Sequence, residues 1–535
     1  MHILDFYPAR GCFSTGETVS LLVEIDASVH QTLQLQLDIQ HLAAPPVTLE
    51  RSFQVAPGRQ IVRMEWIPPS RPAGYSARLW ICPVDGPRSF AASTAFDILP
   101  SWTEFPRYGF LTDFSNSRAD PEATLQNLAR FHINGLQFYD WQYRHDRLLA
   151  PTEEYIDPLG RALSLVSVRK LVDVAHQQGM AALPYLAIYA ASADFWRAHP
   201  NWALYDDAGN PIPFGENFLG LMDPSPGSPW SRHLLDEGMR VLKEIPFDGL
   251  HIDQYGEPKQ VWDAQHQTVD LPSAFVDFIR SATDQHPDQV VLFNAVGNWP
   301  IGALAESAVD FLYIEVWPPD VEYHHLAEIV LNAVRLSRGK AVVIALYLPA
   351  SQPANNLLAD AVILACGGIR IELGEDARLL SDPYFPKHEE IPPDLQLELR
   401  RLSDYAVRNG EWMRPYTLTP AGREMWSQGE WNPPSISVDQ SIWTVVRRYP
   451  ESLSIQLVNF SGLDPHQRWD ESHAAPTIRE NVIVKIQVPH RPSHVLWDVP
   501  KQIQGPRELS FEYDDGTLIF QLPQIHFIGL ISIHE

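Results

Sequence analysis

The 535-residue chain has 40 Lys and Arg against 66 Asp and Glu, and its formal net charge is −26. Such a charge repels nucleic acid and anionic membrane surfaces, which excludes them as expected partners and favours a neutral or cationic ligand. With 45% hydrophobic and 20% charged residues, the composition is that of a folded globular protein, and the length allows about three domains.

The cysteines and the N-terminus bear on the compartment. Cys12, Cys82 and Cys366 lack metal-ligand spacing and are too few for a disulfide framework, so free buried thiols are favoured, with one Cys12–Cys82 bridge as the alternative. The first residues lack a basic segment followed by an apolar one. As given, we expect a cytoplasmic protein, or a secreted one if a signal peptide was removed. The oligomeric state stays open.

Both ends of the chain predict β-structure. Residues 1–100 alternate apolar and polar positions in short runs, such as 20–25 and 60–66. Gly-Glu, Pro-Gly and Pro-Pro pairs separate the runs, as turns separate strands. We therefore predict an Ig-like β-sandwich for residues 1–100. Similar runs return after residue 414, including 452–459, and predict a second β-sandwich for residues 415–535.

The central part alternates buried-type strands with helical segments. We expect eight strands, the number that a closed (β/α)8 barrel requires. The predicted fold class is thus α/β, with a (β/α)8 TIM barrel over residues 101–414 flanked by the two β-sandwiches. The expected strands cover residues 108–114, 135–141, 181–190, 247–254, 290–296, 311–317, 341–348 and 367–374.

The segments between the strands differ in kind. Residues 167–178 have apolar positions at helical spacing and are followed by Gly179, which predicts a helix with a glycine stop. Residues 357–365 predict another helix. Residues 192–230 are rich in Pro, Gly and Trp, and we expect an extended loop over the barrel mouth there.

Two expected strands each carry one carboxylate to their C-terminal end, where the active site of such a barrel lies. The run 247–256 delivers Asp253, and the run 310–318 delivers Glu315. One acid at a strand end is more often an ordinary salt-bridged group, but six ends here carry acids, amides or aromatic rings. Because alternate strands feed the same layer of side chains, the ends of strands four and six can face each other. We predict Asp253 and Glu315 as the catalytic pair.

Other residues at the strand ends suit a neutral sugar. Aromatic rings stack on the apolar faces of pyranoses, and acids and amides bind hydroxyl groups. We therefore expect a neutral oligosaccharide or polysaccharide as the partner. The predicted substrate-binding residues are Tyr139, Asp140, Trp141, Tyr189, His251, Gln254, Asn294, Trp317 and Glu372.

We predict neither a metal site nor a cofactor. No His, Cys or Asp residues stand at ligand spacing, and no glycine loop that could cradle phosphate occurs. The closest candidate is His324-His325, which follows Pro318-Pro319 and is expected to be an ordinary solvated pair.

Several stretches along the barrel resemble one enzyme family. They are GLQFYDWQYRH at 135–145, PYLAIYAA at 184–191, the strand of Asp253, FNAV at 293–296, the strand of Glu315, and ELG at 372–374 with LSDPYFP at 380–386. Together these stretches resemble glycoside hydrolase family 66, the family of endo-dextranases and cycloisomaltooligosaccharide glucanotransferases. The layout of a barrel between two β-domains is also similar to that family.

The resemblance implies an endo-acting, retaining enzyme on α-1,6-linked glucan such as dextran, with Asp253 as nucleophile and Glu315 as general acid/base. A retaining pair lies ~5 Å apart, whereas an inverting pair lies ~6.5 to 9.5 Å apart. The cyclising members carry an inserted carbohydrate-binding module, and no gap here has room for one, so hydrolysis is favoured. Around residues 254–257 the sequence departs from the family pattern, and we expect substrate preference to differ there.

Two alternatives stay open. A transglycosylase would form (cyclo)isomaltooligosaccharides, because sugar can replace water in attacking a covalent intermediate. A non-catalytic glucan-binding protein on a degenerate barrel would keep the rings and amides without turnover. The exact glucan and its chain length are not predicted.

Overall fold

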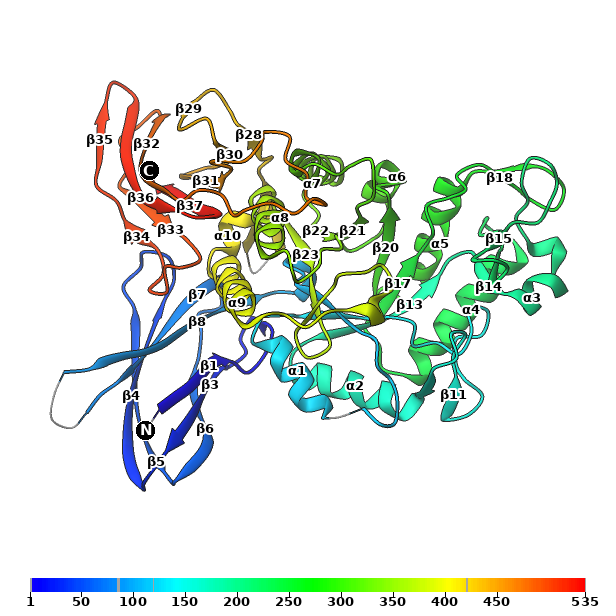
Figure 1. The fold of residues 1–535 in the computed structure, drawn as a ribbon, viewed down its shortest axis with the longest axis horizontal. Coiled ribbons are helices and arrows are strands. Elements are labelled where there is room, and N and C mark those ends of the chain that lie inside the picture. Colours follow the sequence, from blue (N-terminus) through cyan, green and yellow to red (C-terminus); the bar gives the residue numbers. More distant parts are fainter. Residues whose placement is uncertain (1, 84–86, 119, 420–421, 535) are drawn as a thin grey trace.

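The computed structural model describes residues 2–83, 87–118, 120–419 and 422–534. A large parallel sheet with its helices occupies the middle of the molecule, and the N-terminal (blue) and C-terminal (orange to red) strands lie together on one side of it (Figure 1). The segment around β14 to β18 lies at the opposite end. Among the described residues, no helix has the length and apolar character needed to cross a membrane.

The N-terminal strands form two sheets, ordered β1-β3-β6 and β2-β8-β7-β4-β5. Alternating apolar side chains from both sheets, including Leu21, Leu37 and Leu79, form one buried cluster between them, as expected when one face of each strand is turned inward. The strands are β1 (His2–Pro8), β2 (Phe13–Ser14), β3 (Val19–Ala27), β4 (Gln31–Gln40), β5 (Val47–Val55), β6 (Gly58–Trp66), β7 (Ala73–Ile81) and β8 (Ser89–Leu99).

The eight expected parallel strands are all present, and they neighbour one another in chain order. They are β9 (Tyr108–Leu111), β10 (Gly135–Phe138), β13 (Ala181–Ala187), β17 (Gly249–Asp253), β20 (Val290–Val296), β21 (Leu312–Glu315), β22 (Val342–Ala345) and β23 (Gly368–Ile371). The sheet curls back on itself, because β24 (Leu373–Gly374), which follows β23, pairs with β9 through Gly374 and Phe110. A Cβ atom at residue 374 would lie 2.2 Å from the Phe110 carbonyl oxygen, so only glycine permits this approach.

Most of these strands are shorter than expected at their C-terminal ends. Residues 139–141, 188–189 and 316–317 lie beyond the strands, and Ala190 belongs to the separate strand β14. Apolar residues occur here because they pack into the core, as Trp141 and Ile188 do, but they lie beyond the strands of the parallel sheet. The residues at the ends therefore belong to loops that shape the mouth of the sheet.

The helices cover the outside of the curled sheet (Figure 1). The helix expected at 167–178 is α2, capped by the Ser164 side chain, and the one expected at 357–365 is α8, which ends at left-handed Gly367. The helices are α1 (Pro121–Ala129), α2 (Leu165–Gln177), α3 (Ala193–Ala198), α4 (Pro229–Glu244), α5 (Leu271–Gln285), α6 (Ile301–Glu306), α7 (Tyr323–Ser337), α8 (Pro353–Cys366), α9 (Pro393–Arg408) and α10 (Gly410–Met413), with short 3-10 turns η1 (Trp102–Glu104), η2 (Pro200–Trp202) and η3 (Phe385–Lys387).

Residues 192–230, expected as an extended loop over the barrel mouth, contain regular elements, although Phe214 and Phe218 of this segment do line the cavity at the strand ends. This segment contains α3, η2 and a small antiparallel sheet ordered β14-β16-β15. Its Trp196 packs against Gly220 and joins the buried apolar cluster of the central part, which the Pro and Gly content of the segment concealed. The short strands here and nearby are β11 (Glu154–Ile156), β12 (Ala162–Ser164), β14 (Ala190–Ser192), β15 (Pro213–Phe214), β16 (Leu219–Leu221), β18 (Val261–Trp262), β19 (Thr268–Val269) and β25 (Arg378–Leu379).

The C-terminal strands form a second pair of sheets, ordered β28-β30-β31-β37-β33-β34 and β29-β32-β36-β35. Residues such as Ile455, Val484 and Leu518 form a buried cluster shared by both sheets. The strands are β26 (Tyr416–Thr419), β27 (Gly422–Trp426), β28 (Glu430–Trp431), β29 (Ile436–Ser437), β30 (Ile442–Tyr449), β31 (Ser452–Asn459), β32 (Arg479–Gln487), β33 (His494–Asp498), β34 (Arg507–Glu508), β35 (Phe511–Asp514), β36 (Thr517–Ile525) and β37 (Ile528–His534). Cys12, Cys82 and Cys366 are free, as expected, but only Cys366 is buried, and Cys12 and Cys82 are partly exposed.

A buried ion pair joins the N-terminal sheets to the start of the parallel sheet. Arg107, before β9, donates two hydrogen bonds to the carboxylate of Asp97 in β8, at 2.8 and 2.9 Å. Its remaining donors reach the carbonyl oxygens of Gly11 and His132. Both charged side chains are at most 4% exposed, so neither could be well solvated alone.

We predict that Arg107→Met lowers the free energy of unfolding by about 3–5 kcal/mol, because it leaves the Asp97 carboxylate buried without its partner. Adding Asp97→Asn should recover part of the loss. Thermal or urea unfolding measures both. The control is Arg169→Met, which breaks an exposed pair with Glu153 and should cost less than about 1 kcal/mol; equal losses at the two positions would contradict the prediction.

Candidate active site

The two predicted carboxylates lie on either side of one amide. Asp253 ends β17 and Glu315 ends β21, and β20 with Asn294 runs between these strands in the sheet. Asn294 Nδ2 donates to Asp253 Oδ1 and to Glu315 Oε2, at 2.8 Å in each case. The two oxygens therefore lie no further apart than twice this distance. The structure thus brings together the pair that the sequence proposed, with Asn294 joining them.

Glu315 is the more buried carboxyl group, at 8% exposure. Burial raises its pKa, and hydrogen bonds from the side chains of Tyr347, Asn294 and Trp317 oppose this shift. The Tyr347 hydroxyl donates to Glu315 Oε1 at 2.7 Å. Both carboxyl oxygens are therefore held in place, which fixes the direction in which a proton on Glu315 points.

Asp253 is partly exposed towards the mouth of the sheet. Burial raises its pKa to about 7, the charge of Glu315 adds to this shift, and hydrogen bonds from Asn294, Tyr185 and the Gln254 backbone oppose it. Because two neighbouring carboxyl groups in a dry site resist ionising together, the pair keeps one proton near neutral pH. One carboxylate and one carboxylic acid are thus available at the same time.

A cavity of about 310 Å³ opens next to this pair; neither acid lines it, but Tyr185, which hydrogen-bonds to Asp253, does. Aromatic rings and polar groups alternate on its walls, which suits the apolar faces and hydroxyl groups of a sugar. Its lining residues are Tyr139, Asp140, Gln142, His145, Asp157, Pro158, Leu159, Tyr185, Phe214, Phe218, Leu219, Tyr255 and Tyr384.

Four of the predicted binding residues lie at this site. Tyr139 and Asp140 line the cavity, and Tyr139 stacks on Phe385 at 4.3 Å between ring centroids. Burial raises the pKa of Asp140 to about 6. Asn294 and Trp317 contact the carboxyl pair, and Trp317 is 37% exposed, so its ring can also meet a ligand.

Two further predicted residues support the site from behind. Gln254 is fully buried, and its amide donates to the carbonyl oxygens of Asn294 and Trp299. The Tyr189 hydroxyl contacts Gln254 Oε1 and accepts from the backbone amide of Tyr255. These bonds hold the turn after β17 and thereby the position of Asp253.

The remaining three predicted binding residues are not brought to the cavity. Trp141 is buried and donates to the carbonyl oxygen of Tyr185. His251 lies inside the curled sheet, where its Nδ1 is 3.0 Å from the Tyr108 hydroxyl, and burial lowers its pKa to about 3. Glu372 forms an ion pair with Arg370 on the helix side of the sheet. His251 shares a face of β17 with Asp253 but lies two residues deeper, while Trp141 and Glu372 lie outside the strands, so their directions follow from loop packing that short apolar runs do not reveal.

Several residues of the site were missed from the sequence. Tyr185 and Tyr347 hydrogen-bond to the two carboxyl groups, and both stand in apolar strand runs where a core role is the usual reading. Phe214, from the small sheet of residues 192–230, stacks on Tyr255 at 4.0 Å between centroids. No local pattern connects residues that are this far apart in the chain.

A hydrogen-bonded carboxyl pair beside an aromatic cavity, at the C-terminal ends of parallel strands, defines a glycoside hydrolase-type enzyme. The model of glycosyl hydrolase family 66 matches residues 9–531, so the chain belongs to this family. The resemblance found in the sequence is thereby confirmed.

Two curated relatives are cycloisomaltooligosaccharide glucanotransferases from Niallia circulans. One is 26% identical over 366 residues, which cover 63% of this chain and 37% of the relative. The other is 27% identical over 372 residues, with 64% and 38% covered. The chain thus matches less than two fifths of the length of these relatives.

Solved structures share the fold. A Paenibacillus sp. cycloisomaltooligosaccharide glucanotransferase, complexed with cycloisomaltoheptaose, is 20% identical and superposes with a TM-score of 0.88 over 99% of both chains. A noncanonic maltogenic alpha-amylase, AmyB from Thermotoga neapolitana, is 14% identical with a TM-score of 0.51, covering 81% of this chain and 99% of that one.

We predict that Asp253→Asn stabilises the protein at pH 8. Folding raises the pKa of the Asp253 carboxyl group from 3.8 to about 7. The contribution of this group to stability is fully present below the pKa of the unfolded protein and is lost as the pH rises through the pKa of the folded protein. Removing the charge should raise the free energy of unfolding by roughly 1–3 kcal/mol at pH 8 and have little effect at pH 4. Thermal unfolding at both pH values tests this, with the exposed Asp284→Asn as control; an equal effect at both pH values would contradict it.

Proposed function

We propose that the protein is an endo-acting, retaining glycoside hydrolase that cleaves α-1,6-glucosidic linkages in dextran or isomaltooligosaccharides. The observation that carries this proposal is the shared Asn294 amide. It limits the separation of Asp253 Oδ1 and Glu315 Oε2 to about 5.6 Å, which suits the ~5 Å of a retaining pair better than the ~6.5 to 9.5 Å of an inverting pair. Membership of family 66 supports the same reading.

In the proposed mechanism, Asp253 attacks the anomeric carbon while Glu315 donates its proton to the leaving glycosidic oxygen. The pKa values of both acids are raised by burial and opposed by hydrogen bonds, so the pair holds one proton near neutral pH, and the proposed mechanism assigns this proton to Glu315 when substrate is bound. The covalent glycosyl–Asp253 intermediate is then attacked by water, which loses its proton to Glu315, and Asp253 leaves as a carboxylate.

The substrate is proposed to lie along the aromatic cavity. Tyr139, Tyr185 and Tyr255 present ring surfaces beside Asp253, and Asp140 offers a polar group for hydroxyls. Phe214 and Phe218 line the outer part of the same cavity. No step of this mechanism needs a metal ion or a cofactor.

A second candidate is transglycosylation, in which a sugar hydroxyl replaces water in the second step. The names of the curated relatives and the cycloisomaltoheptaose of the Paenibacillus complex favour this reading. Formation of linear or cyclic isomaltooligosaccharides would then compete with hydrolysis at the same two carboxyl groups. A non-catalytic glucan-binding protein is the third reading.

We propose the same three-part architecture as the sequence predicted: a β-sandwich over residues 1–100, a (β/α)8 barrel over residues 101–414 and a second β-sandwich over residues 415–535. The chain-order pairing of the parallel strands and the contact of β24 with β9 support a barrel. The separate apolar clusters of the two β-rich parts support the sandwiches.

We predict that Asp253→Asn and Glu315→Gln each lower kcat on dextran at least about 10²–10⁴-fold, because each removes one partner of the two-step reaction. Release of reducing ends measures this. The exposed Asp284→Asn and Glu306→Gln are matched controls and should stay within twofold of the wild type. Full turnover in both active-site variants would refute the assignment, and absence of turnover in the wild type would favour a pure binder.

We predict that the first reducing ends formed from dextran are α-anomers, because two displacements restore the configuration of the α-linkage. Proton NMR, recorded before mutarotation equilibrates the anomers, tests this, and β-anomers would show inversion. Chromatography of the same digest separates the two candidate activities. Short linear products support hydrolysis, and cyclic products support transglycosylation.

A further inference from the structure

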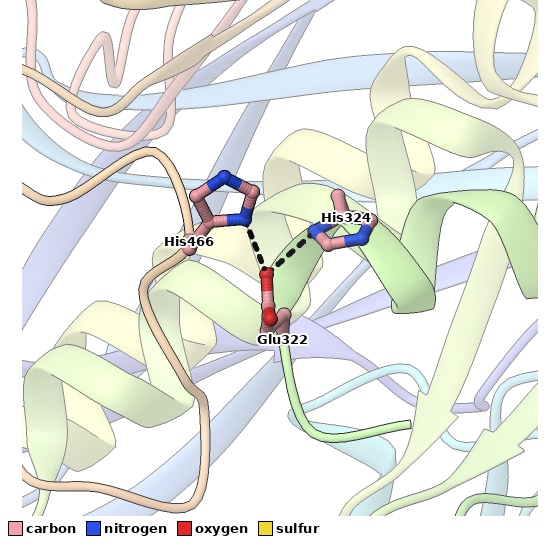
Figure 2. A group of neighbouring side chains, drawn as sticks. All are labelled: Glu322, His324 and His466. Carbon is pink, nitrogen blue, oxygen red and sulfur yellow. Dashed lines mark hydrogen bonds and ion pairs between the residues drawn. The ribbon is translucent and has the colours of Figure 1, made fainter. Parts of the chain in front are cut away.

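Away from the active site, three possible metal ligands meet where α7 begins. Glu322 is the N-cap of α7, His324 lies in its first turn, and His466 comes from the segment that follows β31 (Figure 2). The Nδ1 atoms of His324 and His466 lie 3.0 and 2.9 Å from Glu322 Oε2. All three ligand atoms lie within 4.8 Å of one another. His324-His325 is therefore not the simply solvated pair that the sequence predicted.

The carboxylate of Glu322 is held in place by the helix itself. Its side chain accepts from the backbone amide of His325, and the His325 ring accepts from the backbone amide of Glu322, which is a reciprocal capping box. The orientation of Glu322 Oε2 thus does not depend on the two imidazoles. Such support from a neighbouring hydrogen bond is typical of metal-ligating carboxylates.

The segment that carries His466 is tied to α7 by backbone bonds. The Tyr323 amide donates to the carbonyl oxygen of Gln467, and the Trp469 amide donates to that of Val321. The Trp469 indole also donates to the carbonyl oxygen of Asp320. These bonds hold residues 466–469 alongside residues 320–323, so His466 faces Glu322 because of its backbone register.

A neighbouring cation, Arg468, is mainly paired with other acids, although the charge of Glu322 also acts on it. Arg468 forms ion pairs with Asp470 and Glu471, at 2.7 and 2.9 Å. Its charge is thus largely engaged elsewhere, and Glu322 remains a negative ligand for an added cation.

Two imidazoles and one carboxylate form a donor set for a borderline metal ion. Zn²⁺ binds imidazole nitrogen and carboxylate oxygen at ~2.0–2.2 Å, which sets its ligand atoms ~3.3–3.6 Å apart in tetrahedral or trigonal geometry. The distances from Glu322 Oε2 to the two Nδ1 atoms would each reach this range after a shift of a few tenths of an ångström. Calcium and magnesium prefer oxygen ligands and fit less well.

We propose that Glu322, His324 and His466 form a Zn²⁺ site that links the start of α7 to the segment 464–470 of the C-terminal part. Each histidine would ligate through Nδ1 and carry its proton on Nε2, and water would complete the coordination. None of the three residues lines the aromatic cavity or hydrogen-bonds to Asp253 or Glu315, so the role proposed for the site is to stabilise the contact between the two parts of the chain.

The test uses the full-length protein without a histidine tag, treated with a chelator and dialysed. Titration with ZnCl₂ in a calorimeter should show one tight site per chain, and excess Zn²⁺ should raise the melting temperature. His324→Gln and His466→Gln should each weaken this binding at least about tenfold and abolish most of the thermal shift. Dextran turnover should change less than twofold in both variants, which separates this test from that of the proposed function.

The matched control is His494→Gln. His494 is also an exposed histidine at 2.9 Å from a carboxylate, Glu508, but it forms a single pair, so its loss should leave Zn²⁺ binding within twofold of the wild type. Far-UV circular dichroism checks that each variant is folded. The proposal is overturned if the wild type takes up no Zn²⁺ at micromolar concentrations, or if binding is the same in the wild type, His324→Gln and His466→Gln.

Discussion

The candidate site depends on two carboxyl groups that share one amide donor. Asn294 can reach both Asp253 and Glu315 only because β20 lies between β17 and β21 and all three strands run parallel. Parallel strands bring their C-terminal ends to one edge, where burial raises the pKa of both acids. Because burying two neighbouring carboxylate charges costs free energy, the pair retains one proton near neutral pH. The proposed chemistry uses that proton.

Tightly packed side chains inside the curled sheet support the site from below. His251 precedes Asp253 by two residues and therefore points to the same side of β17. Its ring stacks on Tyr108 and contacts the edge of Tyr313. This buried aromatic layer leaves little freedom for the strand ends above it, so the acids are positioned by packing as well as by hydrogen bonds.

Polar ties connect the β-rich parts to the parallel sheet. Arg107 and Asp97 join the N-terminal sheets to β9, and Arg408 of α9 binds Asp498 of β33 with two hydrogen bonds. The Glu322 cluster is a third contact between these parts, but it is more exposed, with the His466 side chain 78% exposed. Buried charge pairs require good geometry on both sides, so the two buried pairs favour one relative placement of the segments that they join.

The sequence by itself predicted the eight parallel strands and the two acids, Asp253 and Glu315, that the structure brings together, because buried parallel strands appear as continuous apolar runs and deliver their last polar residues to the same edge. It also indicated Tyr139, Asp140, Asn294 and Trp317 as neighbours of those acids. Only the tertiary structure decided which side chains reach the site. Trp141 is buried, His251 lies deeper inside the curled sheet, and Glu372 pairs with Arg370. Tyr185, Tyr347 and Phe214 reach the site from apolar or distant segments. The physical reason is that side-chain direction depends on strand register and long-range packing. The contact between His466 and Glu322, which are 144 residues apart in the chain, depends on such long-range packing too.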